Sequence, residues 1–349
     1  MIQLHTLVSQ HPAASLAFGG LLIGLVFGAM AQRTGFCTLG AISDWTLFGD
    51  KRRLRSWGLA IAIAVAAAQA LHAAGIVNLE QSLYRMGPMP LGGHILGGLL
   101  FGLGMVLTGG CVSRNLIRAG SGDLRALLTL LVIGVIVMVT LSGILGPARV
   151  AFMTATSVAQ PYTLSATHGL MLGLLVATAL LAFCLGDRSF LTSPAHVTAG
   201  VVAGLCVAAG WALTGLAYDE FADMPVQAQS LTFVKPVADT MDWLKRSTAL
   251  GMPGFAIMAV AGTFLGAALA ALASGTFHLS TFADTRDTLR SLAGSILMGV
   301  GGVLALGCSI GQGITGLSTL AAGSLVAAAA IVAGAIAGLK ASERYSILT

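Results

Sequence analysis

Three cysteines lie at equivalent places in three similar stretches of this 349-residue chain. Cys37, Cys111 and Cys308 each stand where a glycine-rich apolar run meets a shorter stretch that is polar and still rich in glycine. A thiol offers a weak S–H donor and a polarisable sulfur surface. These groups suit a soft, sulfur-containing anion better than a hard oxyanion such as phosphate, which calls for several arginines. The three cysteines are therefore candidate contacts for a sulfur-containing anion.

The polar stretches that carry these cysteines are too short to cross a bilayer. They cover 33–48, 110–122 and 307–319, and we interpret 214–221 as an eroded fourth copy. Polar backbone is tolerated at membrane depth only where it is buried in protein or lines a cavity. We therefore predict short re-entrant helices, whose N-termini direct free N–H groups and a positive dipole end at an anion.

Residues beside the cysteines complete the predicted substrate pathway. Arg33 precedes Cys37 by four residues, which is one helical turn, so both side chains could face one cavity. Arg114 could add positive potential, whereas Arg118 and Arg125 are better explained as cytoplasmic anchors. Glycines allow a ligand to approach the backbone closely. The full predicted set is Cys37, Cys111, Cys308, Gly110, Gly307, Arg33, Arg114, Asn115, Ser309 and Gln312.

Other polar and small residues are expected to serve packing. Cys184 and Cys206 lie in the middle of apolar runs, so we expect them to be small, buried packing residues. The polar residues Gln69, His72 and His94 read as hydrogen-bond partners between helices. An odd number of cysteines without a CxxC pair indicates neither a disulfide framework nor a zinc site, and we expect no metal or cofactor. GxxxG spacings around Gly20, Gly98, Gly200 and Gly262 predict tight helix contacts.

The composition sets the class of protein that must position these residues. Hydrophobic residues make up 56% of the chain and charged residues 9%, against about 25% charged in a typical globular protein. So few charges cannot cover a soluble surface, and the sequence predicts an all-α polytopic membrane protein. The net charge of +5 comes without a basic cluster interleaved with aromatics, so no nucleic-acid partner is expected. The first 15 residues lack Lys and Arg and do not read as a cleaved signal peptide.

Apolar runs long enough to cross a bilayer predict about nine transmembrane helices. With the N-terminus outside, the inside segments hold twelve of the 18 basic residues and the outside segments five, with Arg33 apart. The predicted orientation is therefore N-terminus periplasmic and C-terminus cytoplasmic, with 217–250 as an outside loop. The predicted spans are 14–32, 56–77, 91–109, 124–145, 165–185, 195–216, 251–273, 291–307 and 321–339.

The chain contains an internal repeat. The 25 residues from Gly97 match those from Gly294 at ten positions, including the shared Gly-Cys pair, and a weaker match links the run from Gly20 to the run from Gly200. Matched spans are five apart, an odd number, so they cross the membrane in opposite directions. This predicts an inverted repeat of the kind found in secondary transporters, with the site between the halves. The first half is 1–150, 151–194 connects, and 195–349 is the second half, all within one membrane domain.

At these residues the sequence resembles the YeeE/YedE family of bacterial membrane proteins. The resemblance lies in QRTGFCTLGAISD at 32–44, GGCVSRNLIRAGSGD at 109–123 and GCSIGQGITGLSTLAAGS at 307–324, and it covers essentially the whole chain. It implies an inner-membrane, hourglass-like fold of nine spans plus re-entrant helices. It also implies thiosulfate uptake in which Cys37, Cys111 and Cys308 pass the substrate along by S–H···S contacts. A cytoplasmic sulfur-carrier protein is a partner implied by the same resemblance.

Several functions remain open at the level of sequence. The leading hypothesis is a permease, and not an enzyme, that imports thiosulfate or a closely related sulfur anion. The first alternative is a transporter of another sulfur or selenium species. A second is a membrane thiol-redox protein, which needs two cysteines within about 7 Å between Cα atoms. A third is a passive anion channel. The spans contain almost no carboxylates, so no site for a coupling ion is evident.

Overall fold

The computed structural model describes residues 11–160, 162, 165–218, 226–282 and 284–347 and is helical almost throughout. The only strands in the described ranges form one two-residue antiparallel pair, in which Met89 faces Val158. The long helices are α2 (Pro12–Thr34), α4 (Arg52–Ala73), α5 (Leu91–Leu107), α7 (Leu124–Leu141), α9 (Ala166–Leu185), α11 (Pro194–Leu216), α12 (Val234–Leu250), α13 (Phe255–Ala273), α14 (Thr285–Leu304) and α15 (Ala322–Ile347). The shorter elements are α3 (Thr38–Phe48), α6 (Val112–Gly120), α8 (Gly146–Ala155), α10 (Arg188–Leu191), the 3₁₀ turn η1 (Leu79–Gln81), the π-helical turn η2 (Gly311–Gly316), β1 (Met89–Pro90) and β2 (Ser157–Val158).

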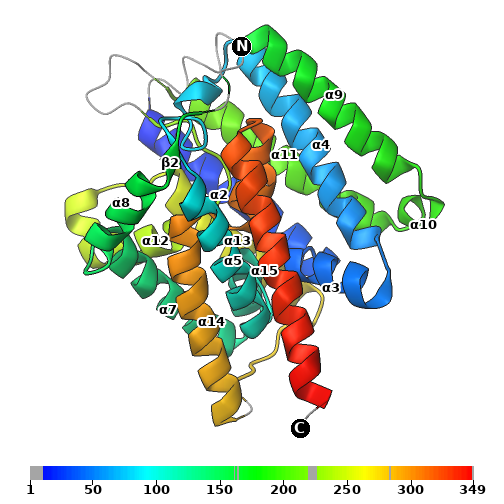
Figure 1. Ribbon diagram of the computed structural model, residues 1–349, viewed down its shortest axis with the longest axis vertical. Helices are drawn as coiled ribbons and strands as arrows, with labels where there is room; N and C mark the ends of the chain where they lie inside the picture. Colours follow the sequence, from blue (N-terminus) through cyan, green and yellow to red (C-terminus); the bar gives the residue numbers. More distant parts are fainter. Residues whose placement is uncertain (1–10, 161, 163–164, 219–225, 283, 348–349) are drawn as a thin grey trace.

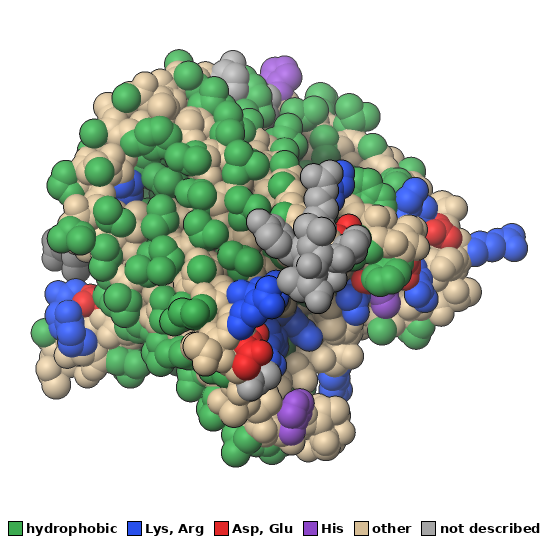
Figure 2. All heavy atoms as spheres, turned by 60° about the horizontal axis from the view of Figure 1, so that its bottom comes forward, with side chains coloured by type: hydrophobic (Ala, Val, Ile, Leu, Met, Phe, Trp, Pro, Cys, Tyr) green, Lys and Arg blue, Asp and Glu red, His purple; other side chains and the backbone are tan. Residues whose placement is uncertain are grey.

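The helices are those of a multi-pass membrane protein. Within the described residues, eight helical segments are long and apolar enough to cross a membrane. The ninth predicted span, 291–307, falls in α14, which is not among these eight and whose first turns carry Arg286, Asp287 and Arg290. Figure 2 shows hydrophobic side chains over most of one face, with charged side chains gathered mainly toward its lower part and its edges. Exposed apolar side chains on membrane helices, such as Met171 and Leu175, face lipid and not water.

Glycine lets the main helices approach each other until their backbones touch. A Cβ on Gly24 would lie 2.3 Å from the Ala259 carbonyl oxygen, and one on Gly262 would lie 2.2 Å from the Leu21 carbonyl oxygen. The predicted packing role of the GxxxG spacings is therefore confirmed for α2 against α13. The same relation holds for Gly102 of α5 against Ile331 of α15. In lipid such close contact is what holds helices together.

The two halves of the chain use the same set of helix pairs. Helix α2 packs on α13 and α5 on α15, each across the two halves, and the pairs that the repeat relates to these, α11 on α4 and α14 on α7, are also formed. The central pairs α5–α14 and α2–α11 join each helix to its own repeat partner. Helix α9 stands outside this scheme and packs on α4 at one side of the molecule (Figure 1). This pairing agrees with a duplicated architecture, and the inversion of the repeat stays a prediction.

Some of the loops that were predicted to lie on the same side of the membrane are in contact with each other. Arg55 forms an ion pair with Asp187 at 2.8 Å, and Arg125 forms one with Asp287 at 3.2 Å, so predicted inside segments meet. Predicted outside segments meet through the β1–β2 pair. In Figure 1, α14 rises from the lower end while α15 descends beside it, so the two helices run in opposite directions. The direction of α14 agrees with a ninth span, which stays a prediction.

The predicted fourth copy at 214–221 is described only in part. Helix α11 continues to Leu216, and 219–221 lie outside the described residues, so this copy stays a prediction. Further along the chain, α12 packs on α13 and α7, as α3 packs on α4 and α15. The 217–250 segment is therefore half helix and not a simple loop. The sequence concealed this because α12 begins without the Gly-Cys signature, at Val234 after the buried Phe233.

Candidate functional site

The three cysteines of the predicted pathway occupy the same kind of local structure. Cys37 is the residue before α3, Cys111 the residue before α6, and Cys308 the residue before a helical segment at 309–318. In each case the cysteine carbonyl accepts a backbone N–H four residues on, at 3.0, 2.9 and 2.7 Å respectively. Each cysteine is thus an N-cap residue, and its side chain lies beside the unpaired N–H groups that begin a helix.

A left-handed residue stands two positions before each cysteine and turns the chain sharply from one helix into the next. These residues are Gly35 (φ 66°), Gly109 (φ 71°) and Leu306 (φ 57°). Gly110 then donates its N–H to the Met105 carbonyl at 2.9 Å, closing the end of α5 in a Schellman turn. Glycine adopts this conformation freely, whereas a leucine there is strained. Glycine therefore marks the turn in the sequence before Cys37 and before Cys111, whereas nothing in the sequence marks the turn at Leu306.

Cys111 lies at the centre of the cluster. Its sulfur is 3.2 Å from the Ser113 hydroxyl oxygen and 4.0 Å from that of Thr38, which is the first residue of α3. The side chains of Cys37 and Ser309 also lie beside it. The first two polar segments and the third therefore meet at this thiol, as the repeat predicts for a site between the halves.

Cys308 lies in a separate, fully buried environment next to Cys111. The Gly311 N–H donates to its sulfur at 3.3 Å, so the thiol itself caps the helix at 309–318. The Thr232 hydroxyl is 4.0 Å from the same sulfur. The phenol oxygen of Tyr84 reaches the same place, 3.5 Å from the position of a Cβ on Gly311. Thr232 and Tyr84 were missed by sequence reasoning, because no repeat or motif marks the loops that carry them.

The residues four positions after two of the cysteines behave alike. The Asn115 amide donates to the Gly110 carbonyl at 2.9 Å, and the Gln312 amide donates to the Ala305 carbonyl at 2.5 Å. Both side chains fold back over the turn before the cysteine. A Cβ on Gly307 would lie 3.3 Å from Cγ of Gln312, so the small residue leaves room for this side chain.

Four buried polar atoms of predicted site residues make no hydrogen bond to the described protein. They are Arg114 Nη1, Asn115 Oδ1, Ser309 Oγ and Gln312 Oε1. Buried polar groups are nearly always paired, and an orphan group calls for a specific reason. Because these four atoms flank the cysteines, the cluster is suited to a small polar ligand that passes between them.

The structure does not support the predicted role of Arg33. Helix α2 ends at Thr34 and Gly35 breaks the helical path, so Arg33 and Cys37 do not share a helix face, and Arg33 is exposed. Arg53 takes its place. It lines a small pocket with Cys37 and contacts Asp44 at 3.3 Å. Beneath it, the rings of Phe36 and Trp57 stack with centroids 5.0 Å apart.

Two cavities adjoin the cysteine cluster. An apolar one of about 150 Å³ is lined by Thr38, Trp57 and Ser309 among others, so it touches residues from both halves. A polar one of about 210 Å³ lies under Asn115 and is lined by Arg118, Arg125 and Arg290. The first is too small for a large organic ligand, since such pockets measure about 300–1,000 Å³. The volumes of these cavities suit a small ion.

Two of the three polar residues that were predicted to join helices do so, and the two cysteines that were predicted to pack are buried. The Gln69 amide donates to the Ser318 carbonyl at 2.9 Å, and His94 contacts the Ala305 carbonyl at 3.3 Å, as packing partners between helices. His72 instead contacts the Val77 carbonyl close by in the chain, at 3.0 Å. Cys184 and Cys206 are buried and all five cysteines are free.

A bundle of membrane-spanning helices with short helices that end at a buried, thiol-lined polar cluster defines a membrane transporter for a small solute. The chain belongs to the sulphur transport family, whose model matches residues 33–337. It is 29% identical over 324 residues to the thiosulfate transporter TsuA of Escherichia coli (strain K12), covering 86% of this chain and 87% of that protein. It is 28% identical over 329 residues to the thiosulfate transporter TsuA of Spirochaeta thermophila, covering 90% of this chain and 96% of that protein.

Proposed function

We propose that this protein is an inner-membrane permease that brings thiosulfate, or a closely related sulfur anion, into the cytoplasm. The observation that carries the proposal is the convergence of three helix N-termini, each of which begins at a cysteine, with Cys37 and Cys308 both next to Cys111. The family and the two transporters named above support the substrate class.

A dianion in a membrane requires compensation, because an unpaired buried charge is prohibitively costly. Here the compensation comes from the helix N-termini that follow Cys37, Cys111 and Cys308, where unpaired N–H groups and dipole ends attract negative charge. Arg114 adds one full positive charge close to Cys37. A single arginine with many weak donors holds an anion without trapping it, which suits passage more than storage.

The order of the contacts suggests a route. Tyr84 and Thr232 flank Cys308 on the side predicted to be periplasmic. The anion then meets Cys111 and Cys37, and Arg53 lies beyond Cys37 on the side predicted to be cytoplasmic. Each sulfur offers a weak donor to the terminal sulfur of thiosulfate, so the ion moves between contacts of similar strength.

The proposal includes an orientation and a compartment. The basic-residue bias supports a periplasmic N-terminus and a cytoplasmic C-terminus in the bacterial inner membrane. The shared helix pairs of the two halves support an inverted repeat of 1–150 and 195–349 about a connecting segment at 151–194. A cytoplasmic sulfur-carrier protein that receives the substrate is a proposed partner.

Uptake of labelled thiosulfate tests the function directly. Cells that lack other sulfate and thiosulfate importers are compared with and without this protein, and uptake should depend on it. Unlabelled sulfate should compete poorly, because it has the charge of thiosulfate but no terminal sulfur for the thiols. Equal transport of sulfate and thiosulfate would contradict the cysteine pathway.

Two alternatives have defined tests. Competition by selenium-containing or persulfide anions that exceeds competition by thiosulfate would favour the first. The adjacency of Cys37 and Cys111 is the observation that favours a thiol-redox protein. In that case Cys37→Ser or Cys111→Ser should abolish the activity completely. A permease should retain partial transport in both, since the hydroxyl still donates a hydrogen bond.

A further inference from the structure

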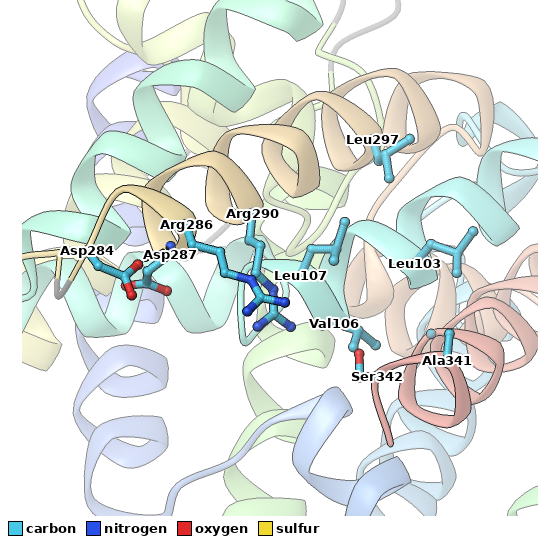
Figure 3. A pocket seen from close by; sticks show the side chains of 11 residues that line it. Leu103, Val106, Leu107, Asp284, Arg286, Asp287, Arg290, Leu297, Ala341 and Ser342 are labelled. Atoms are coloured by element: carbon cyan, nitrogen blue, oxygen red, sulfur yellow. Dashed lines mark hydrogen bonds between the residues drawn. The ribbon is translucent and has the colours of Figure 1, made fainter. Parts of the chain in front are cut away.

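An open cleft of about 670 Å³ separates α14 from α15 over the end of α5, and it shares Arg290 with the polar cavity under Asn115. It lies at the end of the molecule that loop charge predicts to be cytoplasmic. Arg286, Arg290 and Ser342 lie at its polar rim. Figure 3 shows the two guanidinium groups side by side above this cleft, turned away from Asp284 and Asp287. The deeper apolar wall consists of Leu103, Val106, Leu107, Leu297 and Gly338.

The two arginines have no counter-ion among the described residues. Asp284 accepts the Asp287 N–H at 2.7 Å as the cap of α14, and the Asp287 carboxylate pairs with Arg125 at 3.2 Å. Both carboxylates that line the cleft are thus engaged elsewhere. Arg286 also lies in the first turn of α14, where the helix dipole favours an acidic side chain and opposes a basic one. An anion between the two guanidiniums would relieve both effects.

The shape of the cleft indicates what kind of anion fits. Leu297 follows Arg290 by seven residues on a continuous helix, so the apolar wall extends about 10 Å inward from the charged rim. A small hydrated anion would leave that wall uncovered. The neighbouring Leu289 is 62% exposed, which places this end of α14 at the level of lipid. Charge at one end and an apolar channel behind it match an amphiphile.

We propose that this cleft binds one anionic phospholipid from the inner leaflet. The lipid phosphate lies between Arg286 and Arg290, and an acyl chain follows the apolar wall between α14 and α15. Basic residues at the cytoplasmic surface attract anionic lipids in general, but a cleft that joins two unpaired arginines to an apolar wall selects a single molecule. Lipid binding at this cleft does not depend on which anion the protein transports, although Arg290 also lines the polar cavity under Asn115.

Native mass spectrometry of the full-length protein with phosphatidylglycerol and phosphatidylcholine tests the site. The wild type should retain one phosphatidylglycerol in preference to phosphatidylcholine. The double variant R286Q/R290Q should bind it about tenfold less tightly and lose the preference. The matched control is K51Q/R188Q, which removes two exposed charges from the same predicted side and should bind like the wild type.

A third variant separates the cleft from its charges. Ala341 is exposed at the cleft, so A341W should fill the opening and weaken phosphatidylglycerol binding although both arginines remain. An equal loss in K51Q/R188Q, a retained preference in R286Q/R290Q, or unchanged binding in A341W would each overturn the proposal. Displacement of the lipid by inorganic phosphate would assign the arginines to a small-anion site instead.

Discussion

At the scale of single residues, the placement of the cysteines matters more than their number. All five are free, and four of the five are buried. Cys184 contacts the Arg55 carbonyl at 3.2 Å inside a helix interface, as a small packing residue does. Cys111 and Cys308 instead begin helices beside orphan polar atoms. The same side chain therefore serves as filler or as a candidate ligand contact, depending on the backbone that carries it.

The thiols can be separated by alanine substitution. Cys111→Ala and Cys308→Ala should lower thiosulfate uptake about tenfold or more, because a hydrogen bond to a charged ligand contributes roughly 1.5–3 kcal/mol. Cys184→Ala and Cys206→Ala should retain transport, since a small apolar group replaces a small buried one. Initial uptake rates, normalised to folded protein, provide the measurement. Similar losses in all four variants would remove the distinction.

Leu306 provides a second test at this scale. A left-handed backbone costs an L-residue roughly 1–2 kcal/mol, and glycine avoids this cost. Leu306→Gly should therefore be more stable than Leu306→Ala by about 1 kcal/mol, although glycine is ordinarily the less stable of the two. Thermal unfolding of the two purified variants measures the difference. The usual order, with alanine more stable, would show that Leu306 is not strained.

At the scale of elements, the short helices are held by ordinary capping and ion pairs at their far ends. Asp123 accepts the Arg125 N–H at 3.0 Å and so caps α7, and it also receives Arg118 of α6 at 2.6 Å. One carboxylate thus joins the end of a re-entrant helix to the start of a spanning one. This junction lies at the predicted cytoplasmic surface, where the desolvation cost of a charge pair is small.

The junction predicts how stability depends on pH. Burial raises the pKa of Asp123, but the hydrogen bonds and charges of Arg118 and Arg125 outweigh burial and hold that pKa below its usual value. A depressed carboxyl pKa contributes stability above the unfolded value of about 3.9, and the contribution is lost as the pH falls below it. Asp123→Asn should keep the helix cap and lose roughly 0.5–1 kcal/mol at neutral pH.

The check is a series of melting temperatures between pH 7 and pH 3. The wild type and Asp123→Asn should differ at neutral pH and converge at the acidic end. A constant difference across the whole range would show that the carboxylate charge does not contribute.

At the scale of the whole molecule, the packing of two similar halves decides where the site lies. Helices that match in the repeat contact each other directly in the pairs α2–α11 and α5–α14, so the segments that follow them converge. The Ser309 side chain then lies beside Cys111, although 198 positions separate them in the chain. A buried polar cluster in lipid needs such a protein shell on every side.

Topology is the prediction that belongs to this scale. Lys51 and Lys235 are both exposed, and the basic-residue bias places them on opposite sides of the membrane. In intact cells a membrane-impermeant thiol reagent should label a cysteine at position 235 and spare one at position 51. Disrupted cells serve as the control and should label both. Labelling of both positions in intact cells would contradict the orientation.

Composition and periodicity were sufficient to predict the membrane class, most of the spans and the three cysteine segments, because a bilayer restricts spanning structure to helices of a fixed length. The glycine-rich junctions also marked where the chain turns, since glycine is the residue that a left-handed turn favours. Contacts between distant segments could not be predicted in this way. The helix α12, the approach of Thr232 and Tyr84 to Cys308, the replacement of Arg33 by Arg53 and the strained Leu306 all depend on which helices pack together. Local sequence sets how each segment folds, whereas the neighbours of a thiol are set by packing between segments that have no local signal in common.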